Sequence, residues 1–252
     1  MFTRAITRRP SEEMVNGITS ANLGKPDFAL ALKQHDIYCQ TLADLGLDVT
    51  VLDAEPGYPD CCFVEDTAVV CAHVAVLTPL GAPSRQGEQK TIEPELAKHK
   101  PLVKIAPPAL IEGGDVLQVE DTFYVGLSDR TNNEGALALA HAVAPHGYKT
   151  EIIACCPSLH FKTDVNFIGN NTLLLSPCCN EMEQLSGFKR IIVDDDEAYA
   201  RNCLYINGTV IVPDGFPKTL EKVRATGIRT VVIDVSEFRK LDGGLTCLSL
   251  RF

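Results

Sequence analysis

The order of secondary-structure signals repeats along this chain. Asn207-Gly208 is a strong two-residue turn signal between hydrophobic residues 204–206 and 210–212, so these segments predict a β-hairpin. A helix from Lys218 and a strand over residues 230–235 are predicted to follow it. Hairpin signals also occur at residues 63–77 and 116–126. Such recurrence is typical of modules that close around an axis.

Helix and strand signals accompany the other hairpins. Pro26 suits the first turn of a helix with one apolar face, and Gly46 suits its C-terminal cap, before a strand over residues 48–54. A capping box at residues 131–134 predicts a helix that ends near Gly147, before a strand over residues 150–154. Hairpin, helix and strand therefore alternate in a constant order.

The repeat length predicts the domain organisation. The unit is about 50 residues long, and about five units would fill the 252 residues of the chain. Residues 79–89 form the longest loop-like stretch, which is too short to divide domains. We therefore expect one α/β domain over residues 1–252.

The charge of the chain excludes several classes of partner. The formal net charge is −10 and the pI about 5.1, so no broad basic surface is expected for nucleic-acid phosphates or anionic lipid. Apolar runs are far shorter than the ~20 residues of a membrane helix, and the first ten residues lack an apolar stretch of signal-peptide length. We expect a cytoplasmic protein without nucleic-acid or membrane partners.

Ten cysteines raise the question of disulfides. Six of them are adjacent in pairs, at Cys61-Cys62, Cys155-Cys156 and Cys178-Cys179, and adjacent residues close almost no loop. No Cys-x-x-Cys spacing supports structural zinc or a thioredoxin-like site. The sequence therefore predicts free thiols in a reducing compartment.

Acidic residues gather in two places. Asp60 precedes Glu65 and Asp66, and these two can share a ligand only at an irregular strand end, because adjacent residues of a strand face opposite sides. The alternative is one buried and one solvated acid. Glu112 precedes two glycines and Asp115. Glycines permit close backbone approach, although this motif alone favours an ordinary tight turn.

Four further residues could carry chemistry. Cysteine supplies a thiolate nucleophile and histidine a proton donor, which makes Cys247 and His160 candidates beside the acids, although most residues of either type are structural. Residues 158–163, around His160, alternate in a way that predicts a strand. Arg85 and Arg130 could clamp a carboxylate or be solvated. No paired-histidine spacing supports a metal site.

A set of short segments occurs in a definite order along the chain. In that order they strongly resemble the dimethylarginine dimethylaminohydrolases, and the resemblance spans nearly the whole chain. It implies the pentein fold, a five-fold pseudosymmetric α/β propeller of ββαβ modules, in agreement with the repeat. The segments are Asn16-Gly17-Ile18-Thr19, Leu23-Gly24-Lys25-Pro26, Pro59-Asp60, Phe63-Val64-Glu65-Asp66, Ser84-Arg85, Glu112-Gly113-Gly114-Asp115, Arg130-Thr131-Asn132, Leu159-His160-Phe161-Lys162, Asn202-Cys203 and Asp242-Gly243-Gly244-Leu245-Thr246-Cys247.

The resemblance implies a role for each candidate residue. Cys247 matches the nucleophile, His160 the general acid and base, and Glu112 the acid that orients the histidine. The other matches concern substrate binding: Glu65 and Asp66 at the guanidinium, Arg85 and Arg130 at the amino-acid carboxylate, and Asp60 with the backbone carbonyls of Ile18 and Leu241 at the amino group.

The activity implied by the resemblance is hydrolysis of asymmetric dimethylarginine and monomethylarginine. Citrulline and dimethylamine or methylamine would form through a cysteine S-alkylthiouronium, without a metal or a cofactor. Alternatives with the same fold are a free-arginine deiminase, an amidinotransferase, or a ribosome-binding factor without catalysis. A small methylated arginine is the expected partner, and a homodimer stays open.

Overall fold

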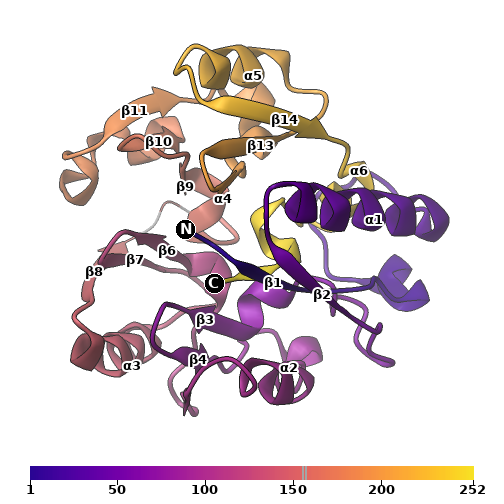
Figure 1. Cartoon of the computed structure of the whole chain (residues 1–252), viewed down its shortest axis with the longest axis vertical. Helices are drawn as coiled ribbons and strands as arrows, with labels where there is room; N and C mark the ends of the chain where they lie inside the picture. Colours follow the sequence, from indigo (N-terminus) through magenta and orange to yellow (C-terminus); the bar gives the residue numbers. More distant parts are fainter. Residues whose placement is uncertain (155, 157) are drawn as a thin grey trace.

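Five three-stranded sheets surround a common centre, and helices lie on the outside of the ring (Figure 1). The computed structural model describes residues 1–154, 156 and 158–252. In each of the five sheets the middle strand pairs antiparallel with the inner strand and parallel with the outer strand. The predicted five-fold α/β propeller of ββαβ modules is confirmed.

The strands follow the predicted repeat. Asn207-Gly208 forms the turn of the predicted hairpin, with positive φ at both residues. From inner to outer strand, the sheets are β15 (Leu250–Arg251), β1 (Arg4–Arg8) and β2 (Asp48–Leu52); β3 (Ala68–Val70), β4 (Ala75–Leu77) and β5 (Leu102–Lys104); β6 (Val116–Val119), β7 (Thr122–Leu127) and β8 (Lys149–Ala154); β9 (Val165–Phe167), β10 (Thr172–Leu175) and β11 (Lys189–Ile192); and β12 (Leu204–Ile206), β13 (Thr209–Pro213) and β14 (Arg229–Ile233).

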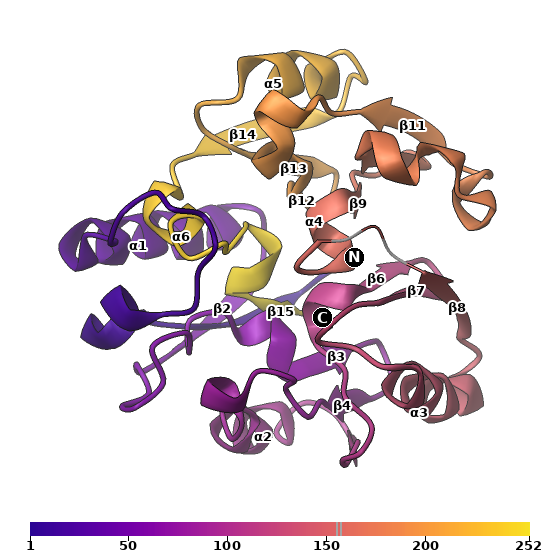
Figure 2. The same ribbon diagram turned by 180° about the vertical axis from the view of Figure 1, so that it is seen from behind.

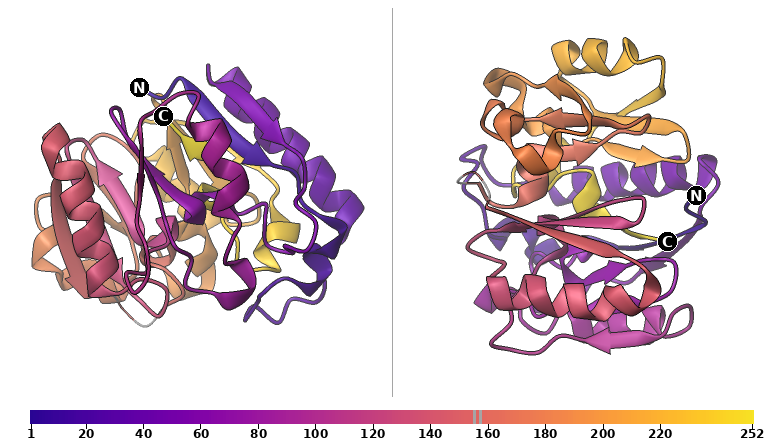
Figure 3. Two further views of the ribbon diagram at one scale, coloured as in Figure 1. Left: turned by 90° about the horizontal axis from the view of Figure 1, so that it is seen from below. Right: turned by 90° about the vertical axis from the view of Figure 1, so that its left-hand side faces the viewer.

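The two ends of the chain meet in one sheet. Strand β15 pairs antiparallel with β1, which sets Ala5 opposite Arg251 and Ile6 opposite Leu250. The backbone N–H of Thr3 also donates to the carbonyl of Phe252 at 2.9 Å. Both ends therefore lie near each other, as the labels in Figure 3 indicate, and their pairing closes the ring.

Helices connect the middle and outer strands in four modules: α1 (Phe28–Asp44), α2 (Gln89–Leu96), α3 (Asn133–Val143) and α5 (Pro217–Arg224). The helix predicted after Pro26 is confirmed as α1, and Asp27 caps it by accepting from the Leu30 N–H. The predicted capping box of α3 is wrong in one detail. Asn132 caps this helix, because the Thr131 hydroxyl donates to Asp115 instead.

The fourth module replaces its α-helix with two 3₁₀ helices, Pro177–Glu181 and Glu183–Leu185. Cys178 in the first of them forms a disulfide with Cys156, with the two Cα atoms 6.4 Å apart. The prediction of free thiols is therefore wrong at these two residues. Adjacent cysteines do not pair with each other; the fold brings together one member from each of two pairs, while Cys155 lies outside the described residues.

A short helical turn precedes the inner strand of every module. The first four turns contact one another in succession along the chain, and the turn before β15 contacts the turn before β3, near the centre of the ring, where Figure 2 places β15. The chain thus delivers the residues before its inner strands to one place. The turns are η2 (Val64–Thr67), η4 (Gly113–Asp115), α4 (Phe161–Asp164), η8 (Asp195–Arg201) and η9 (Thr246–Leu248).

The strand predicted over residues 158–163 is wrong. His160 is the residue before α4, and the backbone turns there instead of running on as a strand. The Asp115 carboxylate accepts the Phe161 N–H at 2.8 Å, which satisfies a donor at the start of the turn. A contact from a distant residue therefore overrides the local alternation of polar and apolar residues.

The core packs between the sheets and the outer helices. Ala136 and Leu139 of α3, for example, pack against Phe123 and Val125 of β7 in one of the buried clusters.

None of the helices within residues 1–154, 156 and 158–252 combines the length and the hydrophobicity of a membrane span.

Candidate active site

A buried histidine and a buried glutamate form the centre of the site. His160 Nε2 lies 2.8 Å from Glu112 Oε2, and the carboxylate of Glu112 is fully buried. The other oxygen of Glu112 accepts the backbone N–H groups of Gly81 and Ala82 at 2.8 and 3.3 Å. Both oxygens of Glu112 are thereby fixed, so the imidazole has one defined orientation.

Surrounding acids control the charge of His160. Burial lowers the pKa of the imidazole, but the carboxylates of Asp66, Glu112 and Asp115 outweigh burial and raise this pKa to about 9. Burial raises the pKa of the Glu112 carboxyl, but the hydrogen bond and charge of His160, together with the charges of Arg85 and Arg130, outweigh burial and hold this pKa well below its usual value. At neutral pH the pair is an imidazolium beside a carboxylate, which suits a proton donor.

Gly113 and Gly114 are required by close approach of the backbone. A Cβ atom at Gly114 would lie 2.7 Å from the His160 ring, and one at Gly113 would lie 1.9 Å from the Glu65 carbonyl oxygen. The ordinary-turn interpretation is therefore incomplete, because only glycine lets this turn pass beside the histidine.

Cys247 lies in the turn η9 and lines a cavity together with Glu65 and His160. Its sulfur accepts the Gly244 N–H at 3.3 Å, and the buried Tyr38 hydroxyl donates to the Leu245 carbonyl at 2.9 Å and holds the same turn. Burial, followed by the charges of Glu65 and Asp66, raises the pKa of Cys247 to about 12. The resting residue is a thiol, and a bound cation would favour its thiolate.

Glu65 and Asp66 are both buried, so the alternative with one solvated acid is wrong. They lie in the 3₁₀ turn η2 rather than on a strand, which frees them from facing opposite sides. Glu65 Oε1 accepts from Lys162 Nζ at 2.6 Å and Arg251 Nη2 at 2.7 Å, while Oε2 accepts from the Thr246 hydroxyl at 2.6 Å. Glu65 thus pairs with two cations.

Asp66 connects the histidine to Arg85. One oxygen of Asp66 accepts the Gly114 N–H at 2.9 Å and lies 4.0 Å from His160 Nε2, and the other accepts from Arg85 Nη1 at 2.6 Å. Arg85 also donates to both oxygens of Glu88 and to the Phe63 carbonyl. This buried guanidinium already has several protein partners.

Arg130 is less constrained than Arg85. Its side chain is 18% exposed, and Nη1 lies 3.6 Å from Glu112 Oε1. The remaining candidates, Asp60, Ile18 and Leu241, lie close to one another. Both oxygens of the buried Asp60 accept the Ile18 N–H at 3.2 Å. A Cβ atom at Gly17 would lie 2.7 Å from Asp60 Oδ1 and 3.2 Å from Leu241 Cδ2, so the backbone at Gly17 passes close to both side chains.

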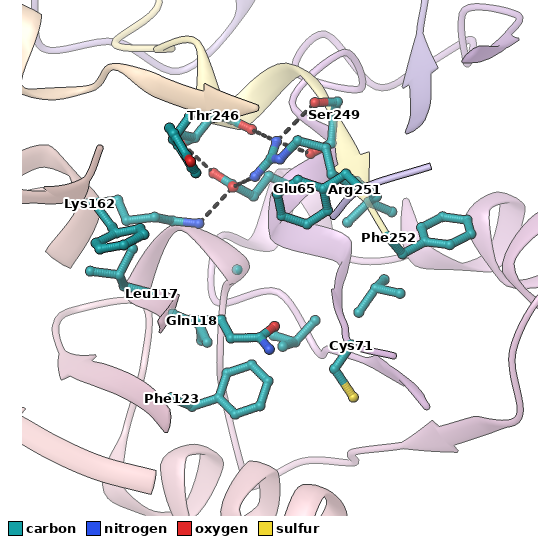
Figure 4. Close-up of a pocket in the computed structure, with 18 of the residues that line it drawn as sticks. Glu65, Cys71, Leu117, Gln118, Phe123, Lys162, Thr246, Ser249, Arg251 and Phe252 are labelled. Atoms are coloured by element: carbon teal, nitrogen blue, oxygen red, sulfur yellow. Dashed lines mark hydrogen bonds and ion pairs between the residues drawn. The ribbon is translucent and has the colours of Figure 1, made fainter. Parts of the chain in front are cut away.

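Two cavities meet at Glu65. A cavity of about 100 Å³ is lined by Cys247, His160 and Glu65, and a larger one of about 500 Å³ by Arg251, Phe123 and Glu65. Figure 4 shows the larger one, with Lys162 and Arg251 converging on the Glu65 carboxylate. Glu65, Lys162 and Thr246 line both cavities, so they form the partition between them.

Sequence reasoning missed several residues that organise the site. Lys162 and Arg251 form ion pairs with Glu65, and Asn202 holds η9 by accepting the Thr246 N–H at 2.9 Å. Asp115 fixes the backbone after His160. Lys162, Asn202 and Asp115 belong to the segments that carry the family resemblance, which was an available signal, whereas nothing local marks Arg251.

Some of these groups could hold a metal. Among the described residues, ligand atoms of Asp66, Glu112 and His160 lie within 4.8 Å of one another. Those of Cys156, Asp164 and Cys179 do so too, but the Cys156 sulfur is in a disulfide and offers no thiolate to a metal. The side chains of the first group hydrogen-bond to one another, to backbone N–H groups and to Arg85. The expectation of a metal-free site stays a prediction.

Comparison with known proteins identifies the family. A model of the eukaryotic N,N dimethylarginine dimethylhydrolase family matches residues 20–186. The N(G),N(G)-dimethylarginine dimethylaminohydrolase of Pseudomonas aeruginosa is 39% identical, with 100% of both chains covered. That of Streptomyces coelicolor is 34% identical over 98% of this chain and 96% of its own length. The chain belongs to the dimethylarginine dimethylaminohydrolase family.

Solved structures agree with this family assignment. A variant of the Pseudomonas aeruginosa dimethylarginine dimethylaminohydrolase, complexed with citrulline, has a TM-score of 0.98 at 38% identity and covers 100% of both chains. The N-terminal domain of the arginine dihydrolase ArgZ from Cyanobacteria has a TM-score of 0.88 at 19% identity, covering 98% of this chain and 96% of its own. This second likeness shows the fold alone. As a family member, the chain is a hydrolase of carbon–nitrogen bonds.

Proposed function

We propose that this enzyme hydrolyses asymmetric dimethylarginine and monomethylarginine to citrulline and the corresponding methylated amine. The observation that carries the proposal is the cavity lined by Cys247, His160 and Glu65, in which a thiol, an imidazolium and a carboxylate surround one small space. These groups are a nucleophile, a proton donor and an anion for a guanidinium.

The first half-reaction begins when the guanidinium binds near Glu65 and Asp66. Its positive charge offsets the carboxylates that disfavour the Cys247 thiolate, so binding promotes ionisation of the nucleophile. The sulfur attacks the guanidinium carbon and a tetrahedral adduct forms. His160 gives its proton to the methylated nitrogen, the carbon–nitrogen bond breaks, and an S-alkylthiouronium remains on Cys247.

The second half-reaction uses the same histidine as a base. His160, now neutral and held by Glu112, removes a proton from water as the oxygen attacks the thiouronium carbon. The carbon–sulfur bond then breaks, the sulfur departs as thiolate, and the remaining hydroxyl proton is lost to solvent as the carbonyl of citrulline forms. The buried Glu112 keeps the imidazole in one orientation through both steps.

The amino-acid end of the substrate would occupy the neighbouring group of residues. We propose that Asp60 and the carbonyls of Ile18 and Leu241 receive the amino group. Arg85 and Arg130 are the proposed carboxylate residues, and their different surroundings suggest a division of labour. Arg130 is freer to contact substrate, whereas Arg85 also holds Asp66 in place.

The whole of residues 1–252 is proposed to act as one catalytic domain. Cys247, Glu65, Glu112 and His160 come from four different modules, and β15 pairs with β1 to complete the ring. Separate folding of a part would leave the site incomplete. Global thermal unfolding followed by circular dichroism in the far and the near ultraviolet should then give one common transition, whereas two separate melts would indicate two domains.

Parallel assays of citrulline formation test the activity. The substrates are asymmetric dimethylarginine, monomethylarginine, symmetric dimethylarginine and arginine, each with and without a chelator. We expect the first two to have the highest kcat/KM and the chelator to leave turnover intact. Preference for arginine would favour a deiminase, production of a new guanidine compound with an added amine would favour an amidinotransferase, and no citrulline from any substrate would refute the assignment.

A further inference from the structure

Three sulfur atoms lie together beside the segment that carries His160. Cys156 and Cys178 form a disulfide, and the sulfur of Cys179 lies 3.6 Å from that of Cys156. Cys178 is exposed, Cys156 is half-buried, and Cys179 is fully buried. The free thiol therefore contacts the half-buried sulfur of the disulfide.

We propose that these three cysteines form a thiol–disulfide exchange centre. The Cys179 thiolate attacks the sulfur of Cys156, the Cys156–Cys178 bond breaks, and a Cys156–Cys179 bond forms. The electron pair of the broken bond leaves on Cys178, which takes up the proton that Cys179 has lost. One disulfide and one thiol are present before and after the step, so no oxidant or reductant is consumed.

The surroundings of Cys179 determine how exchange depends on pH. Burial is the main cause that raises the pKa of this thiol; the Asp164 carboxylate raises it further, while Ser176 and the Arg201 guanidinium lower it. The thiol is therefore mostly protonated at neutral pH. Since only the thiolate attacks, exchange should accelerate as the pH rises.

The three sulfurs differ in their access to solvent, so they can react with different molecules. Exchange moves the free thiol from the buried Cys179 to the exposed Cys178, where small electrophiles and low-molecular-weight disulfides in solution can reach it. The centre thus transfers reactivity from the interior to the surface without a net change in oxidation.

The exchange centre is connected to the histidine on both sides. The Ser158 hydroxyl lies 3.4 Å from the Cys156 carbonyl and 3.1 Å from the His160 carbonyl, within hydrogen-bonding distance of both. On the other side, the carbonyl of Asp164, in the turn α4, accepts the Ser176 N–H at 2.8 Å. Either disulfide therefore ties the segment around His160 to the Pro177–Glu181 helix.

A trapping experiment tests the exchange. The protein as isolated is incubated with excess iodoacetamide at several pH values, acid-quenched, digested without reduction and mapped by mass spectrometry. We expect a Cys156–Cys179 disulfide together with alkylated Cys178, formed about tenfold faster per pH unit between pH 7 and 8.5, where thiolate limits the rate.

Two variants define the outcome. Cys179→Ser should retain Cys156–Cys178 and yield no alkylated Cys178, whereas Cys203→Ser, which removes a buried thiol elsewhere, should behave like the wild type. Equal alkylation of Cys178 in the Cys179→Ser variant would overturn the proposal, as would a product in which Cys155 replaces Cys179. If Cys179→Ser does not fold, absence of the Cys156–Cys179 peptide from trapped wild-type protein is decisive.

A complementary variant tests the same contact from the other direction. Cys178→Ser leaves Cys156 and Cys179 as neighbouring thiols, and oxidised glutathione should join them with release of two reduced glutathione molecules. Persistence of both free thiols would contradict the proposed proximity. These measurements need no turnover, so failure of the proposed enzymatic activity would not be confused with failure of the exchange centre.

Discussion

The His160 Nε2 atom lies 2.8 Å from Glu112 Oε2, and this contact joins a proton donor to a carboxylate inside the protein. Its electrostatic effect has a definite sign. The folded-state pKa of His160 is about 9, against 6.5 for an unperturbed imidazole. Protonated His160 therefore makes its full contribution to the stability of the fold below pH 6.5. That contribution is lost as the pH rises through about 9.

Glu112→Gln should therefore move the basic limit of activity to lower pH. Loss of the carboxylate charge lowers the pKa of His160, and we expect the basic limb of kcat to shift by roughly one pH unit or more. The measurement is a pH–rate profile for citrulline formation. Glu134→Gln, at an exposed position of α3, is the control. An unchanged basic limb in the Glu112 variant would disconnect this contact from proton transfer.

Cys247→Ser should abolish turnover while substrate still binds. Serine preserves the approximate size but is a far weaker nucleophile, so kcat should fall by at least about 10³-fold. Acid-quenched wild-type enzyme should also carry a substrate-derived adduct on the peptide that contains Cys247. Cys71→Ser, at a buried thiol that lines the larger cavity but not the cavity with Cys247, should keep its activity. Near-normal turnover by the Cys247 variant would refute covalent catalysis at this residue.

Gly114→Ala should displace the histidine. The added Cβ would lie 2.7 Å from two atoms of the His160 ring, so the ring or the turn must move, and kcat should fall on the order of 10²-fold. Gly187→Ala is the matched control, because a Cβ there has no heavy atom within 4 Å. Steady-state kinetics and a thermal melt distinguish displacement from unfolding. Equal kcat values for the two variants would contradict the packing argument.

Arg251→Met should weaken both the fold and the substrate site. Arg251 donates to Glu65 and to the carbonyls of Thr246 and Ser249, and its loss leaves buried acceptors unsatisfied. We expect a stability loss of about 1–3 kcal/mol and a higher KM. Urea unfolding measures the first effect and initial rates the second. Arg4→Met removes an exposed ion pair and should change little.

Arg130→Ala should act mainly on substrate binding. Loss of a charge-assisted contact to the substrate carboxylate should raise KM roughly tenfold or more, with a smaller effect on kcat. Arg85→Ala should lower kcat as well, because Arg85 also holds Asp66. Arg229→Ala, on the exposed side of β14, is the control for loss of charge. A dominant kcat effect in the Arg130 variant would exclude a role limited to carboxylate binding.

Local signals predicted much of the architecture. The Asn207-Gly208 turn and the helix between Pro26 and Gly46 depend on backbone preferences of the residues themselves, and both elements are present. The repeated order of such signals was sufficient to predict five modules. Sequence periodicity is informative where a segment's neighbours in the chain decide its conformation.

Long-range contacts explain the errors. The turn after His160 is fixed by Asp115, 46 positions before Phe161, and the partition at Glu65 depends on Arg251, 186 positions later. The Cys156–Cys178 disulfide likewise joins two segments that the pairs of adjacent cysteines did not reveal. No local sequence pattern predicts contacts between residues so far apart in the chain. The family resemblance supplied the candidate residues, but not the contacts that hold them.

The seam between β1 and β15 connects the integrity of the fold to the chemistry. Cys247 lies in the turn just before β15, so opening of that seam would withdraw the proposed nucleophile while the other sheets remain paired. Partial opening of this kind costs less than global unfolding. Turnover during gentle denaturation would then stop before the bulk of the secondary structure melts, and the enzyme's own reaction becomes a sensor for the earliest break in the ring.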